Sequence, residues 1–259
     1  MMITDAHLHL PVGDAYPTLQ SKKEKLLAEL DENHAARCIV IADSWQETEI
    51  GTTDELTALF PRQAQSRVFV VGGISPLVQF EETLADLRRH LEQKQIVGIK
   101  LYPGHEPFCL TDARLSSVYE TALQYQVPVL FHSGWEHPEY GDADAAAAVL
   151  ERYPELRLVC CHCWYPQIGK CMQMLAYPNL YFDLSSVADE AEVPEQIASG
   201  VRRLTEAVPE RVLFGSDSFG CSMAQHIRFL RDMHLPPETE RLVFHENAGR
   251  LYQLEQGRA

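Results

Sequence analysis

Eight short runs of β-branched and other apolar residues recur along the chain, each followed by a stretch with the spacing of an amphipathic helix. Near-continuous apolar strands that alternate with helices indicate a parallel sheet covered on both faces. Eight such units predict an α/β fold, a single (β/α)8 TIM barrel with an extra C-terminal helix, for which 259 residues suffice. An open doubly wound sheet is the main alternative, but no Gly-x-Gly-x-x-Gly follows the first strand.

The expected elements follow one another without a linker or a low-complexity segment, so we expect residues 1–259 to form one domain. The expected strands span residues 3–5, 38–42, 68–74, 96–101, 127–132, 156–162, 180–184 and 211–217. The expected helices span residues 19–34, 54–60, 80–91, 112–125 (capped by Thr111 or Asp112), 143–153, 168–175, 194–207, 223–233 and 238–254.

The first expected strand leads into the sequence Asp5-Ala6-His7-Leu8-His9. Side chains alternate between the two faces of a strand, so His7 and His9 point the same way and Leu8 points into the packing. Two imidazoles on one face at the end of a strand can hold two corners of a metal's coordination sphere. Such a pair also arises by chance, so it supports a metal site only if further candidate ligands stand at the ends of other strands.

Polar residues stand at several other strand ends of the expected barrel. Barrel enzymes build their sites where the strands end, and closing the barrel brings these positions to one mouth. Burying such side chains unpaired in a core would be costly, which favours a metal site over simple packing. The residues are His7, His9, Lys100, His132, His162 and Asp217.

These residue types suit Zn²⁺ or another divalent ion such as Mn²⁺. A divalent metal lowers the pKa of a bound water toward neutrality, and Asp217 could then take the proton and pass it to the leaving group. His162 could bind a second ion or hydrogen-bond the water or the substrate's oxyanion. Lys100 could stabilise a negative charge, form a carbamate that bridges two ions, or simply pair with a nearby carboxylate.

Composition excludes several classes of partner. The net charge of −15 argues against nucleic acid, because phosphate binding needs a surplus of Lys and Arg. No apolar run approaches membrane-spanning length, and the start lacks the pattern of a signal peptide. Seven cysteines in a chain without an export signal favour reduced thiols and a cytoplasmic location.

The combined motifs resemble the amidohydrolase superfamily over nearly the whole chain, and in particular its amidohydrolase-related branch of TIM-barrel metal-dependent hydrolases. By that resemblance His7, His9, His132 and Asp217 match the metal ligands, and Asp217 and His162 match the groups that handle water and substrate. The motifs span residues 5–9, 98–103 and 128–134, His162, and residues 214–218 and 246–251. The branch includes lactonases, amide hydrolases, and decarboxylases or hydratases of unsaturated acids.

Two departures from the resemblance matter. Superfamily members often carry small residues soon after the sixth-strand histidine, whereas Cys163 and Trp164 follow here, and Trp164 is expected to wall the pocket. TatD-type deoxyribonucleases also have an H-x-H. Their pattern, however, has Glu at the end of the fourth strand, where this chain has Lys100. Together with the acidic composition, this substitution argues against a nuclease.

Other suggestive features carry less weight. The run Cys160-Cys161-His162-Cys163 cannot converge on one ion, because adjacent residues of a strand face opposite sides. Structural thiols flanking one functional histidine are the favoured interpretation, and Cys221 is expected to be a bystander. Substrate contacts and surface packing stay open for loop residues Tyr102, His105, Trp135, His137 and Tyr140, whereas the acids near Asp189, Glu190 and Glu192 are expected to form a solvated loop.

The leading hypothesis is a metal-dependent hydrolase acting on an amide, lactone or ester of a small molecule, with one or two ions per chain. A metal-dependent decarboxylase or lyase of a small carboxylic acid on the same site is the alternative. A non-catalytic metal-binding or ligand-binding barrel is the third hypothesis. It is disfavoured because the residues needed for catalysis, an open ligand set and a water-activating carboxylate, are both present. One ion is preferred to two, since the resembling branch is often mononuclear and the chain offers no bridging ligand besides a carbamylated Lys100. The sequence leaves the substrate, the metal and any homo-oligomer undetermined.

Overall fold

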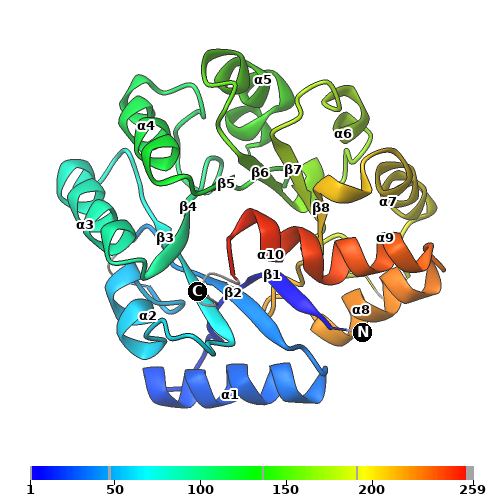
Figure 1. Cartoon of the computed structure of the whole chain (residues 1–259), viewed down its shortest axis with the longest axis horizontal. Coiled ribbons are helices and arrows are strands. Elements are labelled where there is room, and N and C mark those ends of the chain that lie inside the picture. The colour runs from blue at the N-terminus through cyan, green and yellow to red at the C-terminus, as the bar shows by residue number, and fades with distance from the viewer. Residues whose placement is uncertain (1, 46–47, 136, 191, 255–259) are drawn as a thin grey trace.

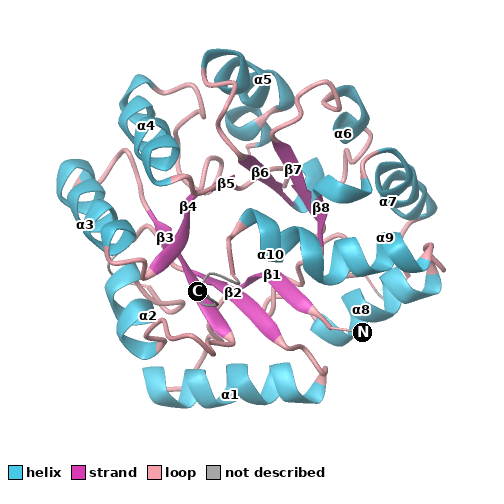
Figure 2. Ribbon diagram, in the orientation of Figure 1, coloured by secondary structure: helices cyan, strands magenta, loops and turns pink. Residues whose placement is uncertain are grey.

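A computed structural model describes residues 2–45, 48–135, 137–190 and 192–254 of the chain. Its eight strands form one parallel sheet in the order β1 to β8, which confirms the predicted (β/α)8 barrel (Figure 2). The strands are β1 Thr4–Leu8, β2 Arg37–Ile41, β3 Val68–Gly73, β4 Ile96–Leu101, β5 Val129–Phe131, β6 Leu158–Cys161, β7 Leu180–Asp183 and β8 Val212–Leu213.

Helices surround the strands in a ring, and the C-terminal helix lies across the middle of the view in Figure 1. The α-helices are α1 Leu19–Glu32, α2 Thr53–Leu59, α3 Phe80–Glu92, α4 Ser116–Tyr125, α5 Ala143–Arg152, α6 Lys170–Gln173, α7 Glu195–Ala207, α8 Met223–Asp232, α9 Pro237–Arg241 and α10 Asn247–Leu251. Short 3₁₀ turns add η1 Ala113–Leu115, η2 Pro138–Gly141, η3 His162–Trp164 and η4 Pro209–Arg211, and a π-helical turn, η5 Leu242–Glu246, joins α9 to α10.

Contacts between the two ends of the chain close the barrel. The amide of Ala6 donates to the carbonyl of Phe214 at 2.8 Å, and the amide of Asp217 donates to the carbonyl of His7 at 2.8 Å. The residues after β8 therefore leave the regular ladder with β7 and bond to β1 instead. For this reason the eighth strand is shorter than the 211–217 predicted, while β1 extends to Leu8 rather than ending at Asp5.

Two apolar cores hold the elements in place. The larger core lies between the strands and the surrounding helices, and includes Leu8, Leu26 and Phe131. The smaller core fills the barrel interior, where side chains such as Ile41 and Leu213 pack with others from α10 and the residues after it, namely Ala248, Leu251, Tyr252 and Leu254. The C-terminal helix therefore closes one end of the barrel, and the accessible mouth is the other end, where the carboxyl ends of the strands lie.

Several predicted boundaries differ from the structure. The helix predicted for residues 168–175 is only the single turn α6, and the one predicted for 238–254 is three joined segments, α9, η5 and α10. The fifth strand begins at Val129 rather than residue 127, and Pro128 before it has no N–H for the ladder. The single-domain prediction also includes residues 1, 46–47, 136, 191 and 255–259, which lie outside the described residues.

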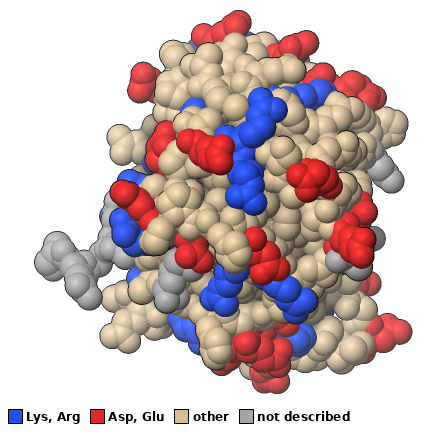
Figure 3. All heavy atoms as spheres, turned by 90° about the vertical axis from the view of Figure 1, so that its right-hand side faces the viewer, with Lys and Arg blue, Asp and Glu red and all other residues tan. Residues whose placement is uncertain are grey.

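No helix among the described residues has the length and apolar character needed to cross a membrane. On the face shown in Figure 3, acidic side chains lie between and around the basic ones, so the charge of this face is mixed.

Candidate metal centre

A cavity of about 260 Å³ opens where the strands end, and it brings together every site residue predicted from the sequence. Residues far apart in the chain reach it from β1, β4 and the segments after β5, β6, β7 and β8, as closure of the barrel requires. The described residues that line it are His7, His9, Lys100, Tyr102, His105, His132, Trp135, His162, Ser186, Asp189 and Asp217.

The two histidines of the first strand face the same carboxylate. Nε2 of His7 lies 3.4 Å from Oδ1 of Asp217, and Nε2 of His9 lies 3.3 Å from the same oxygen. Leu8, between them, is buried in the outer core. The alternation of the strand thus places both imidazoles on one side, and the bend after β8 brings Asp217 to them.

Hydrogen bonds on the far side of each imidazole determine which nitrogen carries the proton. Nδ1 of His7 lies 2.5 Å from Oδ2 of Asp183, and Nδ1 of His9 lies 3.2 Å from the carbonyl oxygen of Ile41. A carboxylate and a carbonyl only accept, so Nδ1 is the protonated nitrogen in both rings. In the neutral rings, Nε2 of His7 and Nε2 of His9 therefore present lone pairs toward Asp217.

Asp217 is held as an anion in this cluster. Burial favours a raised pKa for its carboxyl group, but His9, His7 and His162 beside it outweigh burial and hold that pKa well below its ordinary value, because the carboxylate would accept from or pair with any of these imidazoles that takes up a second proton. Ser186 donates to Oδ2 at 2.7 Å, so Oδ1 is the oxygen that faces the two histidines.

These residues fit a divalent ion. The ligand atoms of His7, His9 and Asp217 lie within 4.8 Å of one another, and three acceptors so close together repel unless a cation or an extra proton lies between them. In addition, Nε2 of His7 and Nε2 of His132 are buried and have no hydrogen-bond partner. Such orphaned nitrogens are expected where a metal completes the hydrogen-bonding and charge balance.

His132 follows β5 and lies among other imidazoles. Its ring centroid is 4.0 Å from that of His105 and 4.9 Å from that of His162. Burial, together with the neighbouring charges of His162, His105 and Lys100, lowers the pKa of His132. A neutral imidazole results, which is the form that binds metals.

His162 lies in the left-handed turn η3, directly after β6. Its Nδ1 lies 3.2 Å from the carbonyl oxygen of Ser185, so Nδ1–H donates and Nε2 is free for the cavity. Burial lowers the pKa of His162 to about 3. His162 is therefore a neutral imidazole beside the candidate metal position.

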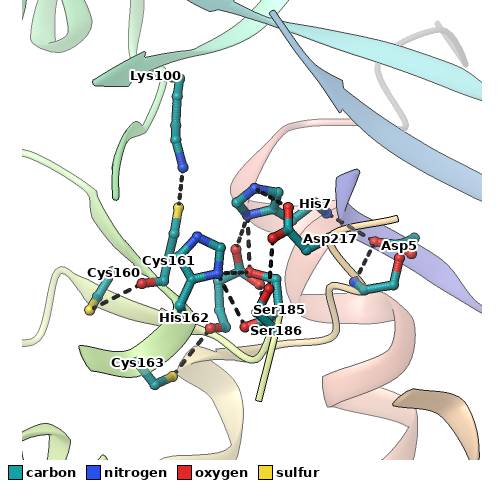
Figure 4. A network of polar contacts seen from close by, with 12 residues as sticks. Asp5, His7, Lys100, Cys160, Cys161, His162, Cys163, Ser185, Ser186 and Asp217 are labelled. Atoms are coloured by element: carbon teal, nitrogen blue, oxygen red, sulfur yellow. Dashed lines mark hydrogen bonds and ion pairs between the residues drawn. The ribbon is translucent and has the colours of Figure 1, made fainter. Parts of the chain in front are cut away.

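Lys100 enters the cavity from β4, and Figure 4 shows its ammonium directed at Cys161. Its Nζ donates to Sγ of Cys161 at 3.0 Å and lies 5.2 Å from the centre of the Tyr102 ring. Among the described residues no carboxylate lies within ion-pair distance of Lys100, so the structure gives no support to the simple ion pair that was one of its alternatives. Burial raises the pKa of Cys161 to about 12, and the thiol is therefore neutral.

Sequence reasoning missed the polar residues that support the predicted ones. At the end of β7, Asp183 contacts His7, and Ser185 and Ser186 contact His162 and Asp217. On β1, the buried carboxyl group of Asp5 accepts hydrogen bonds from the amides of His7 and Ser216 and so ties β1 to the segment after β8; burial raises its pKa to about 7. Acidic residues at strand ends were the available signal for Asp5 and Asp183.

Trp164 is a correction to the sequence analysis. It was expected to wall the pocket, but it is 2% exposed, packs in the outer core, and donates from Nε1 to the carbonyl of Gly141. The left-handed backbone of η3 turns it away from the mouth. Trp135, not Trp164, is the tryptophan among the described residues that lines the cavity, and it stacks on Tyr165 with ring centroids 4.6 Å apart.

The cysteine run behaves as its alternation predicts. Cys160 belongs to the outer core and Cys161 to the barrel interior, so the two thiols face opposite sides of β6. Asp189 is exposed, as expected for a solvated loop, and it also lines the cavity. Cys221 lies next to the site, with Sγ 3.3 Å from the hydroxyl of Ser186.

Comparison with known proteins identifies the family. A family model described as "Amidohydrolase" matches residues 4–254. An uncharacterized TIM-barrel protein of Bordetella bronchiseptica is 19% identical, with a TM-score of 0.82 over 100% of both chains. A putative 2-pyrone-4,6-dicarboxylic acid hydrolase of Pseudomonas putida is 16% identical, with a TM-score of 0.73 over 98% of both chains.

A 5-carboxyvanillate decarboxylase of Sphingomonas paucimobilis is 14% identical, with a TM-score of 0.65 over 97% of this chain and 98% of the other. Identities this low show a shared fold and do not transfer an activity. No curated protein sequence matches the chain.

Proposed function

The chain belongs to the amidohydrolase family, whose model matches residues 4–254, and from that premise we propose that it is a metal-dependent hydrolase of a small amide, lactone or ester. The observation that carries the proposal is the convergence of Nε2 of His7, Nε2 of His9 and Oδ1 of Asp217, together with the buried Nε2 atoms of His7 and His132, which have no hydrogen-bond partner. We propose His7, His9, His132 and Asp217 as the ligands of Zn²⁺ or another divalent ion such as Mn²⁺.

When bound, a divalent ion supplies a Lewis acid that brings the pKa of water close to neutrality. Asp217 then acts as the proton acceptor, because its low pKa keeps it ionised and its Oδ1 faces the ligand cluster. His162 presents a neutral Nε2 to the same cavity and orients water or the substrate through a hydrogen bond. The cavity admits only a small substrate.

Lys100 stabilises the negative charge that develops on the substrate. It is 1% exposed, lines the cavity, and within the described part of the chain donates to one partner, the neutral thiol of Cys161. An ammonium group has three N–H donors, so Lys100 retains hydrogen-bonding capacity for an oxyanion. In a buried site such a charge stabilises an anion more strongly than it does in water.

Decarboxylation of a small carboxylic acid is the second candidate, and Lys100 is the specific observation that favours it. The buried ammonium group could hold a substrate carboxylate as readily as an oxyanion. Decarboxylases also appear among the structures that share this fold. The two reactions differ in product, since hydrolysis releases an acid and an amine or alcohol whereas decarboxylation releases CO₂.

A panel of small lactones, amides, esters and carboxylic acids tests the proposal, with acid release and CO₂ release recorded in parallel. Activity should disappear after chelation and return with Zn²⁺ or Mn²⁺. His9→Ala should abolish it, whereas His137→Ala, which removes an exposed histidine outside the cavity, should not. CO₂ release alone would favour the lyase, and unchanged activity in metal-free protein would contradict both.

A further inference from the structure

The end of β7 supplies none of the proposed ligands, yet it contacts three of the proposed functional residues. Figure 4 shows two of its residues, Ser185 and Ser186, beside His162 and Asp217. Asp183 reaches His7, the carbonyl of Ser185 reaches His162, and Ser186 reaches Asp217 by the contacts given above. This segment, residues 183–186, is therefore placed to orient the side chains around the cavity.

Asp183 makes the shortest of these contacts and the one with the clearest chemical consequence. Its carboxylate is 1% exposed, and Oδ2 lies 2.5 Å from Nδ1 of His7. The other oxygen, Oδ1, accepts from the amide of Ser185 at 2.9 Å. Both oxygens thus face donors, and the carboxylate can neither rotate nor donate without losing one of these bonds.

We propose that Asp183 is a positioning residue that holds the proton of His7 on Nδ1 and thereby makes Nε2 the available metal ligand. Neutral histidine has two tautomers, and only the one with an unprotonated Nε2 can bind an ion on the cavity side. Partners of this kind set the orientation and basicity of metal-bound imidazoles in general. The inference rests on the proposed function for the ion itself.

The two oxygens of Asp183 make a specific substitution informative. In Asp183→Asn, the amide of Ser185 still requires an acceptor, so the side-chain oxygen takes the position of Oδ1. The NH₂ group must then face Nδ1 of His7 and donate to it. This forces the proton of His7 onto Nε2, where it blocks the ion. Asp183→Ala removes this acceptor and leaves the hydroxyl of Ser185, 3.1 Å from Nδ1 of His7, as a partner, so it does not impose the wrong tautomer.

The test compares Zn²⁺ affinity, measured by competition with a chromophoric chelator, in the wild type and both variants. Asp183→Ala should weaken binding by about 10- to 100-fold, the usual effect of losing such a partner. Asp183→Asn should weaken it further, although it is the more conservative change. Asp54→Asn is the matched control, since Asp54 contacts a histidine, His90, at 2.6 Å outside the cavity. Equal affinities in the wild type and Asp183→Asn, or a larger loss in Asp183→Ala, would overturn the proposal.

Nitrogen-15 NMR of the metal-free protein provides a second readout that does not depend on activity, and its wild-type measurement does not depend on the stability of any variant. His7 of the wild type should show a protonated Nδ1 and an unprotonated Nε2, and Asp183→Asn should reverse the two. A proton on Nε2 of His7 in the wild type would overturn the role of Asp183. Absence of Zn²⁺ binding by the wild type would instead contradict the proposed function, and the NMR result would still decide the role of Asp183.

Discussion

Ser186 donates a hydrogen bond of 2.7 Å to Oδ2 of Asp217, so the two carboxylate oxygens have different partners. Oδ2 is engaged by the hydroxyl group, whereas Oδ1 faces Nε2 of His7 and Nε2 of His9. Both Ser186 and Asp217 have positive φ, at 58° and 60°, a conformation that non-glycine residues adopt rarely. Strain of this kind in two residues that contact each other is typical of functional sites.

Asp217→Asn should lower the turnover rate by a factor on the order of 10² or more, because the amide cannot accept a proton. The variant should keep much of its metal, since the side-chain oxygen and the histidines remain. Elemental analysis beside steady-state kinetics separates the two effects. Near-normal turnover would show that another group, most plausibly His162, is the base.

His7→Ala combined with His9→Ala should remove the metal and leave the barrel folded. The side chains lie at the mouth, while the interior core and the outer core supply the stability. We expect about one ion per wild-type chain and none in the double variant, by elemental analysis, with similar far-ultraviolet circular dichroism. Active wild-type protein without metal would contradict the mechanism.

Lys100→Met should leave the metal content at one ion per chain and lower activity. Nζ of Lys100 donates to the thiol of Cys161, and without a carbamate Lys100 adds no bridging ligand for a second ion. Removal of one electrostatic contact to the developing charge typically costs a factor of about 10² to 10³ in rate. A content near two ions in the wild type that falls to one in the variant would instead indicate a bridging carbamate.

Glu106→Gln should stabilise the protein relative to the wild type as pH rises. Burial raises the pKa of Glu106, although hydrogen bonds from Ser44 and Ser75 oppose this shift. The folded state therefore binds this proton more tightly than the unfolded chain, so wild-type stability falls from the ordinary pKa of Glu up through the raised one. Gln has no such ionisation, and it can both donate to and accept from the two hydroxyls.

Urea unfolding of the wild type and Glu106→Gln at pH 4 and pH 8 measures this effect. The difference in the free energy of unfolding should favour Gln more at pH 8 than at pH 4. Glu106→Ala is the control that loses both hydrogen bonds, and it should be destabilised at both pH values. A difference that does not change with pH would contradict the assigned shift.

Periodicity was sufficient to predict the barrel, because eight buried parallel strands leave an apolar pattern that few other folds share. It also selected the residues that meet at the mouth, since their position at strand ends follows from topology alone. The pattern could not predict the direction of Trp164, which depends on a left-handed turn of non-glycine residues. Nor could it predict that β8 would end at Leu213 in order to bond with β1.

The residues that contact the predicted site residues from behind, such as Asp183 and Cys161, were harder to predict because their roles depend on contacts between distant parts of the chain. Asp183 was visible as a polar residue ending an apolar strand, but its role depends on a 2.5 Å contact with a residue 176 positions away. Cys161 as the partner of Lys100 was equally inaccessible, because a thiol at a barrel-interior position has the sequence pattern of an ordinary core residue.

The packing of α10 across one end of the barrel determines from which side small molecules can enter the cavity. Ala248, Leu251 and Tyr252 fill one end of the barrel, so the cavity has its opening at the other end. On the proposed function, an ion held by His7, His9, His132 and Asp217 and a substrate in the cavity would enter from the same side of the barrel. A substrate bound in the cavity should therefore slow the removal of the ion by a chelator.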